Sequence, residues 1–137
     1  MGEIRVQVKL TNAIDEGLLR RGQLAADQVR RYEAKALVDT GAVCTILPVH
    51  VVEQLGLSIV GQRIAEFADG RKEIVGITEP MTINISGRRT ADEALVLGDE
   101  ILIGQTVLEK LDLLADCANH MVVPNPAHPD QPVNKVK

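Results

Sequence analysis

The 137-residue sequence has no tryptophan and only one tyrosine, Tyr32, and one phenylalanine, Phe67. Because 45% of the residues are still hydrophobic, the core must be built from Val, Ile, Leu and Ala. A core rich in β-branched side chains favours sheet over helix. The length fits one domain, large enough to bury a core without disulfides or a structural metal.

Cysteine is also scarce. Cys44 and Cys117 lie far apart in the sequence and form no C-x-x-C pair. Two isolated cysteines are typical of reduced, buried thiols rather than of a disulfide framework. A metal site is not predicted, since no cysteine or histidine pair has the spacing of ligands.

The sequence has no surplus of positive charge and no long apolar run. It carries 15 basic and 19 acidic residues, a formal net charge of −4, so no nucleic-acid partner is expected. The first ten residues, MGEIRVQVKL, are interrupted by charges, whereas a signal peptide or membrane span needs an uninterrupted apolar stretch. We therefore expect a cytoplasmic protein without a membrane partner.

The hydrophobic periodicity predicts strands and a few short helices. Residues 3–10 alternate between apolar and polar, as in a half-buried strand. Residues 11–31 change to a helical period broken near Gly22, which indicates an insertion between strands. Turn signals predict hairpins around residues 68–71, 86–88 and 117–119. Short helices are expected at residues 48–55 and at 106–111, the second starting with a capping box from Thr106 to Glu109.

The most unusual stretch is residues 36–48. An apolar strand ending at Val38 is followed by Asp39-Thr40-Gly41-Ala42, and apolar residues resume at Val43. An aspartate flanked in this way is expected to lose hydration, so it must find hydrogen-bond donors, shift its pKa or take part in chemistry. The plainer interpretation is an ordinary turn in which the aspartate caps its own backbone.

Three features taken in order resemble the retropepsin-like aspartic proteases, in particular their bacterial and archaeal stand-alone members. They are the strand ending in Asp39-Thr40-Gly41-Ala42, a central hairpin with Gly70 at its tip, and the run Leu102-Ile103-Gly104 leading into a short helix. The resemblance covers roughly residues 3–123. It implies a mostly β fold, the closed β-barrel half-domain of the acid proteases with one or two short helices.

The resemblance also implies a chemistry. Aspartic proteases use two carboxylates that share one proton, because two like charges a few Å apart cannot both ionise. Only one Asp-Thr-Gly is present, so the second carboxylate would come from a second copy in a two-fold symmetric homodimer. One Asp39 would act as general base on a bound water, and its protonated partner would polarise the scissile carbonyl of a peptide. No cofactor or metal is implied.

Other residues receive roles by the same resemblance. Thr40 would bond across the dimer axis, Gly41 would allow close approach, and Ala42 would offer a small side chain and an N–H beside the carboxylate. The hairpin tip would form a flap that closes over substrate, and Gly104 would pack behind the catalytic loop. The tip consists of Ala68, Asp69, Gly70 and Arg71, whose charges depart from the Gly-rich, apolar tip of many relatives.

Three alternatives stay open. The same dimer could be a catalytically inactive module that binds peptides or serves a structural role, since fold does not dictate function. Phosphate chemistry would need a Walker A or G-x-G-x-x-G pattern, and neither occurs. A thiol hydrolase or metal site would have to use Cys44 with His50, His120 or His128, whose spacing is not that of a site.

The expected organisation is a protease domain over residues 1–123, containing the insertion at 11–31, followed by a Pro-rich tail at 124–137. The tail should be extended or disordered. Family members dimerise through strands near the chain ends, which the insertion and the tail would modify. The aliphatic composition predicts pockets beside Asp39 that prefer apolar side chains next to the cleaved bond.

Overall fold

The computed structural model describes residues 2–136, and the chain is mostly β. Nine strands form one mixed sheet in the order β4-β5-β8-β3-β9-β2-β1-β6-β7, and β10 and β11 form a separate two-stranded sheet. The strands are β1 (Ile4–Asn12), β2 (Arg31–Asp39), β3 (Thr45–Leu47), β4 (Ile59–Glu66), β5 (Lys72–Thr78), β6 (Met81–Ile85), β7 (Arg88–Asp92), β8 (Ala94–Val96), β9 (Leu102–Gly104), β10 (Leu113–Asp116) and β11 (Met121–Pro124). The helices are α1 (Ala13–Arg20), η1 (Ala26–Gln28), α2 (Val49–Leu55) and α3 (Gln105–Leu111).

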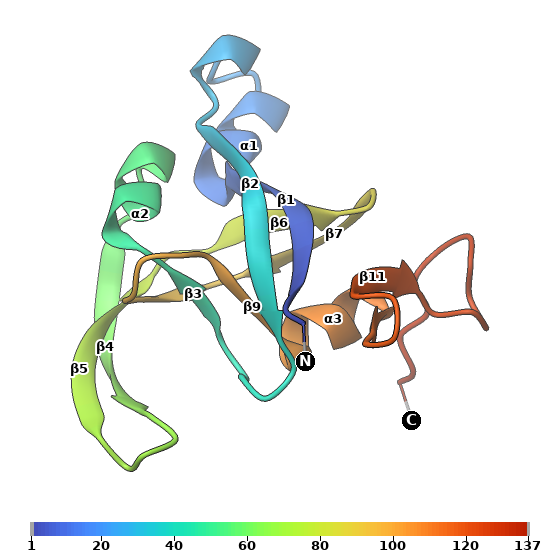
Figure 1. Cartoon of the computed structure of the whole chain (residues 1–137). Coiled ribbons are helices and arrows are strands. Elements are labelled where there is room, and N and C mark those ends of the chain that lie inside the picture. The colour runs from blue at the N-terminus through green and yellow to red at the C-terminus, as the bar shows by residue number, and fades with distance from the viewer. Residues whose placement is uncertain (1, 137) are drawn as a thin grey trace.

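The predicted closure of the sheet into a barrel is wrong. The strand order is linear, and the edge strands β4 and β7 do not pair with each other. Figure 1 shows the sheet as a strongly curved, open surface in which the β4–β5 hairpin projects away from β6 and β7. Alternating patterns predict strands and their buried faces, but they do not say whether the two outer strands meet.

The long antiparallel pair β1 and β2 forms the middle of the sheet. Val8 pairs with Ala34, and Val6 pairs with Ala36. Val8 and Leu10 are fully buried from one face of β1, as the alternation of residues 3–10 predicts. Beside β2 runs the parallel strand β9, where Val38 pairs with Ile103, and this central position buries Ile103 completely.

The predicted helical turns of residues 11–31 are α1 and η1, which lie at the end of β2 remote from Asp39 (Figure 1). The buried Asn12 begins α1 by accepting a hydrogen bond from the Asp15 N–H at 3.0 Å. Its amide also donates to the Leu55 carbonyl at 2.8 Å, which ties α1 to α2. Asp15 is buried and forms an ion pair with Arg30 at 2.8 Å.

Helix α2 follows the prediction, with Pro48 before its first residue and Gly56 after its last one in the left-handed conformation (φ 62°). His50 on α2 is exposed. The capping box at Thr106 is wrong, because α3 begins at Gln105 after Gly104. Because β9 ends at Gly104 and α3 begins at the next residue, Thr106 lies inside the first turn of the helix.

Three hairpins were predicted from turn residues, and the first two are present in the main sheet. The β4–β5 hairpin turns at residues 67–71, where the Gly70 N–H donates to Phe67 O at 2.9 Å and Gly70 has a φ of 84°. The β6–β7 hairpin turns at Ser86 and Gly87, which both have positive φ. Its next residue, Arg88, belongs to β7 and is buried.

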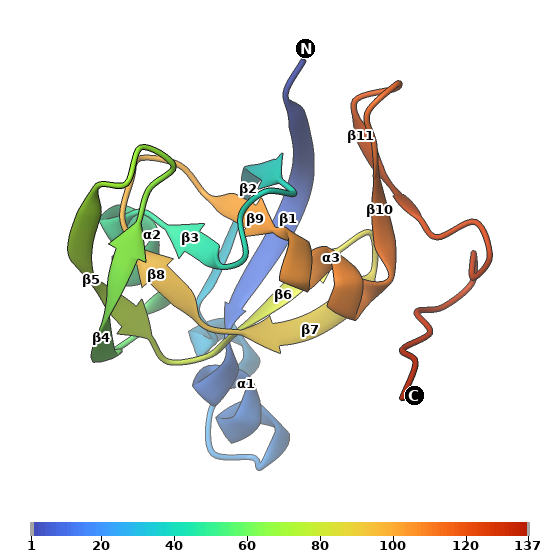
Figure 2. The same ribbon diagram turned by 90° about the horizontal axis from the view of Figure 1, so that it is seen from below.

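The predicted final hairpin around Cys117 is confirmed as β10–β11, which packs beside α3 and β1. Figure 2 shows it apart from the main sheet. In the part of the chain that the structure describes, residues 125–136 have no helix or strand. Several of them are nevertheless held by hydrogen bonds to the end of α3.

Candidate active site

Asp39 is the last residue of β2 and begins a tight loop that leads to β3. Its Oδ1 accepts a hydrogen bond from the Gly41 N–H at 2.9 Å, and its carbonyl accepts one from the Ala42 N–H at 3.1 Å. These two bonds fix the carboxylate against its own loop. The plain interpretation as a turn is therefore correct for the backbone, and the same turn holds the Asp39 side chain in one orientation.

The expected burial of Asp39 is wrong for the single chain, in which Asp39, Thr40 and Gly41 are all exposed. The physical reason is that the loop is covered on one side only, by the start of α3. Its other side forms part of the molecular surface at the lower end of Figure 1. Nothing in one chain therefore excludes water from the carboxylate.

Gly104 closes the covered side of this loop. Asp39 pairs with Gly104 in the parallel β2–β9 ladder, and the Gln105 N–H donates to Ala42 O at 2.9 Å. A Cβ on residue 104 would lie 2.7 Å from Ala42 O and 3.0 Å from the Val43 carbonyl carbon. Only glycine fits behind the loop, so the structure brings together the predicted residues Asp39, Gly41, Ala42 and Gly104.

A polar contact that the sequence analysis missed anchors the other end of the loop. Thr45 is fully buried at the start of β3, and its Oγ1 donates to Asp92 Oδ2 at 2.8 Å. The other oxygen of Asp92 lies 3.5 Å from Lys110 Nζ on α3. Because Thr45 stands in an apolar run and Asp92 is 47 residues away, no local pattern joins them.

The tip of the β4–β5 hairpin lies on the same side of the molecule as the Asp39 loop (Figures 1 and 2). Its residues are exposed, and they stabilise one another. Asp69 Oδ1 accepts from the Arg71 N–H at 2.9 Å, and the Arg71 guanidinium lies 4.5 Å from the centre of the Phe67 ring. Within residues 2–136, no hydrogen bond joins the tip to the Asp39 loop.

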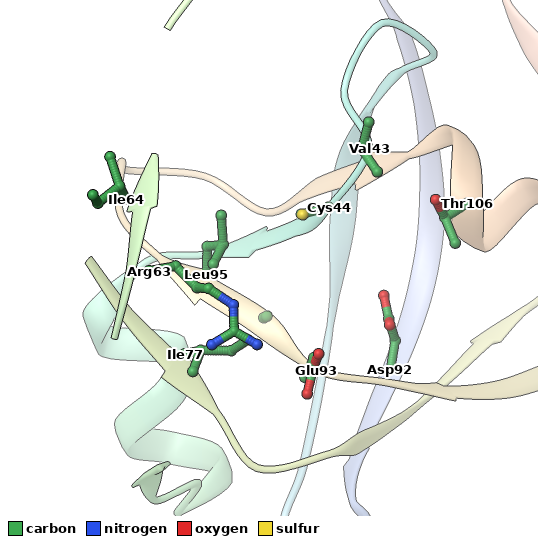
Figure 3. A pocket seen from close by; sticks show the side chains of 10 residues that line it. Val43, Cys44, Arg63, Ile64, Ile77, Asp92, Glu93, Leu95 and Thr106 are labelled. Carbon is green, nitrogen blue, oxygen red and sulfur yellow. The ribbon is translucent and has the colours of Figure 1, made fainter. Parts of the chain in front are cut away.

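A cavity of about 260 Å³ lies between the end of the Asp39 loop, the hairpin and β8 (Figure 3). Val43 and Cys44 line it from the loop, and Ile64 lines it from the hairpin. Figure 3 shows the Asp92 and Glu93 carboxylates and the Arg63 guanidinium along the same cavity. Its other lining residues are Ile77, Ala94, Leu95 and Thr106.

The cavity walls are therefore partly apolar and partly charged, whereas the aliphatic composition predicted pockets that prefer apolar side chains. Arg63 belongs to β4 and Glu93 lies between β7 and β8, and no sequence motif relates them. Neither forms an ion pair with another of the described residues. Charged side chains are thus available to a ligand at this cavity.

The prediction of buried cysteines is wrong, because Cys44 and Cys117 are both exposed. Cys44 lines the cavity, and Cys117 lies in the β10–β11 turn. Among the residues described here, no three His, Cys, Asp or Glu side chains are grouped to hold a metal ion. No helix within residues 2–136 has the length and apolar character that crossing a membrane requires.

The chain is similar to known proteins in sequence and in fold. Residues 27–110 match the model of the family described as "gag-polyprotein putative aspartyl protease". The fold is similar to the crystal structure of the retroviral protease-like domain of Ddi1 from Leishmania major, with a TM-score of 0.56 at 16% identity. The alignment covers 96% of this chain and 90% of that chain. Curated protein sequences yield no significant match.

Proposed function

Because the chain belongs to the gag-polyprotein aspartyl protease family, we propose that it is an aspartic endopeptidase that is active as a homodimer. The observation that carries the proposal is the Asp39 loop. One Asp-Thr-Gly per chain is held by its own backbone on one side and left open on the other. A second copy that faces this open side would supply the second carboxylate and remove the loop from water.

The reaction follows from two Asp39 side chains that share one proton. The unprotonated carboxylate takes a proton from a bound water, and that water attacks the carbonyl carbon of the scissile peptide bond. The protonated Asp39 of the other copy polarises the carbonyl oxygen, and a proton then passes to the leaving nitrogen. Thr40 is exposed beside the carboxylate, and we propose that it bonds to the second copy.

The β4–β5 hairpin is proposed to act as the flap. Its tip projects freely on the side of Asp39, and β4 is an edge strand of the sheet. An extended peptide can therefore pair with unpaired backbone groups and be covered by residues 68–71. Closure of the tip would exclude water from the reacting bond.

Substrate preference is proposed to come from the cavity beside the loop. Val43 and Ile64 offer an apolar wall for one side chain of the peptide, and both are more than two-thirds exposed without a ligand. Covering such surface favours apolar residues near the cleaved bond. Arg63 and Glu93 add polar contacts at the cavity.

The surface that joins two copies is proposed to include the outer face of the β10–β11 hairpin. Leu114 and Met121 are 46% and 47% exposed on this face. A two-stranded sheet is marginal by itself, and an apolar outer face gains stability when another chain covers it. The hairpin lies near the start of β1, so the interface would involve strands near both chain ends.

The proposal is tested by cleavage of a peptide library between acidic and neutral pH. Asp39→Asn should lower the rate by roughly 10²–10⁴-fold, because the amide can neither accept nor donate the catalytic proton. Asp27→Asn, in η1 at the far end of β2, is the matched control and should leave the rate unchanged. Absence of cleavage by the wild type at every pH would favour the inactive peptide-binding or structural dimer.

We also propose that the protein works in the cytoplasm, because two isolated cysteines without a disulfide framework are typical of a reducing compartment. Fractionation of cells that produce the full-length protein tests this location directly.

A further inference from the structure

A single aspartate contacts three residues of the C-terminal segment. Asp112 follows α3, and its carboxylate accepts hydrogen bonds from Asn125 Nδ2 and from the Val133 N–H, both at 3.0 Å. His128 Nδ1 lies 2.6 Å from the same carboxylate. These contacts hold the pKa of Asp112 below its usual range. We call residues 125–134 the C-terminal strap.

The buried Arg88 completes this arrangement from β7. Its guanidinium donates to the carbonyls of Leu111 at 3.0 Å and Asp112 at 2.8 Å, at the end of α3. It also donates to the carbonyl of His128 in the strap at 2.7 Å. Three carbonyl oxygens, two of them at the negative end of a helix, thus satisfy one buried cation.

Asp112 is locally a poor residue for its position. Its backbone is left-handed, with a φ of 55°, a conformation in which glycine is preferred after a helix. A negative charge at a helix C-terminus is also unfavourable to the helix dipole. The helix alone gives no reason for an aspartate here, whereas the three contacts to the strap do.

The strap also closes the base of the β10–β11 hairpin. Asp112 immediately precedes β10 and Asn125 immediately follows β11. The two residues are joined twice, since the Asn125 N–H donates to Asp112 O at 3.1 Å in addition to the side-chain bond. Farther along, Asn134 Nδ2 donates to Lys110 O at 3.2 Å.

We propose that Asp112 and Arg88 hold the strap against α3, where it closes the base of the β10–β11 hairpin. Release of the strap loosens this hairpin and weakens the association of two copies. The effect of strap release on the association of two copies rests on the proposed function, whereas its effect on the hairpin does not. The C-terminal segment is then a conformational control of the domain and not a passive tail.

The decisive variant is Asp112→Gly in the full chain. Glycine suits the left-handed backbone, so it would preserve or improve the end of α3 if Asp112 were only a helix cap. If the strap depends on Asp112, the Val133 and Asn125 amides and those of β10 and β11 will exchange with deuterium about tenfold faster or more. Ser86→Gly, also at positive φ but in the β6–β7 turn, is the matched control and should change none of these amides.

Two further measurements keep the proposal falsifiable. His128→Ala removes one contact to Asp112 and keeps the backbone carbonyl that Arg88 uses, so it should give a smaller increase in the same amides. Sedimentation should show a raised dimer Kd for Asp112→Gly. Unchanged deuterium exchange in Asp112→Gly would overturn the proposed role of the strap. Faster exchange with an unchanged dimer Kd would overturn its proposed effect on association. A monomeric wild type would contradict the proposed function, and the exchange data would still decide on the strap.

Discussion

Gly104 lies directly behind Ala42, so that a Cβ on residue 104 would come within 2.7 Å of the Ala42 carbonyl oxygen. This contact joins β9 to the loop that carries the candidate catalytic aspartate. Because the neighbouring atoms belong to the backbone, they cannot move aside as the end of a flexible side chain could. The position of Asp39 therefore depends on the absence of a side chain at residue 104.

Replacement of Gly104 by alanine should displace the Asp39 loop. We expect a loss of about 1–3 kcal/mol in the free energy of unfolding, as for other overpacked sites, together with loss of peptidase activity. Chemical denaturation and a cleavage assay measure the two effects. Gly17→Ala, in α1, is the control, since the nearest atom to its added Cβ is 3.7 Å away. Wild-type stability in Gly104→Ala would show that the loop is not held from behind.

Ile64 should contribute to substrate preference through the cavity. Ile64→Asp is expected to lower kcat/KM for peptides with apolar side chains by about tenfold, because one aliphatic contact is lost. Ile64 is 69% exposed, so the fold should be unaffected. Ile74→Asp is a close control, since Ile74 pairs with Ile64 across the hairpin and is 68% exposed but does not line the cavity. Equal losses in both variants would contradict a role specific to the cavity.

Asp15 should make stability depend on pH in the acid range. Hydrogen bonds from Arg30 hold the pKa of Asp15 below its usual range. The stabilisation is therefore fully present above the ordinary carboxyl pKa of about 4, and it is lost as the pH falls through the lower pKa of the folded state. Asp15→Asn should cost about 1–3 kcal/mol near neutral pH, and the difference from wild type should shrink below about pH 4.

Urea denaturation at a series of pH values measures this difference. Asp27→Asn, an exposed aspartate in η1, should follow the wild type throughout. A constant gap between Asp15→Asn and wild type down to pH 2 would show that the Asp15 charge is not what stabilises the junction between α1 and β2.

Leu114 should contribute to the association of two copies. Leu114→Glu places a charge on the outer face of β10–β11, and in a symmetric interface the two introduced charges lie on the same patch. We expect the dimer Kd to rise about tenfold or more, with little change in monomer stability because Leu114 is 46% exposed. Concentration-dependent sedimentation measures this change. Val60→Glu, on the exposed edge strand β4, is the control, and an equal effect there would argue against the hairpin as an interface.

The parts of the fold that depend on neighbouring residues could be predicted from the sequence. The strand that ends at Asp39, the Gly70 hairpin and the helix between Pro48 and Gly56 each have a pattern within about ten residues. The contact of Gly104 with the loop was implied by the family resemblance, and the structure supplies the steric reason for it.

The parts that depend on distant residues could not be predicted. Closure of the sheet depends on whether β4 reaches β7, and no local pattern encodes that. Thr45 with Asp92 and Arg88 with His128 are polar pairs separated by 47 and 40 residues. The exposure of Asp39 was missed for a related reason, since its apolar neighbours along the chain do not cover it in space.

The central claim is that each active site uses one Asp39 from each of two chains, and subunit mixing tests it most directly. A fixed amount of wild type is equilibrated with increasing amounts of Asp39→Asn, and cleavage is measured after exchange of subunits. Random pairing predicts that an equal amount of variant lowers the activity to about half and that an excess abolishes it. Activity that stays constant at every ratio would show that one chain cleaves alone, which contradicts the account.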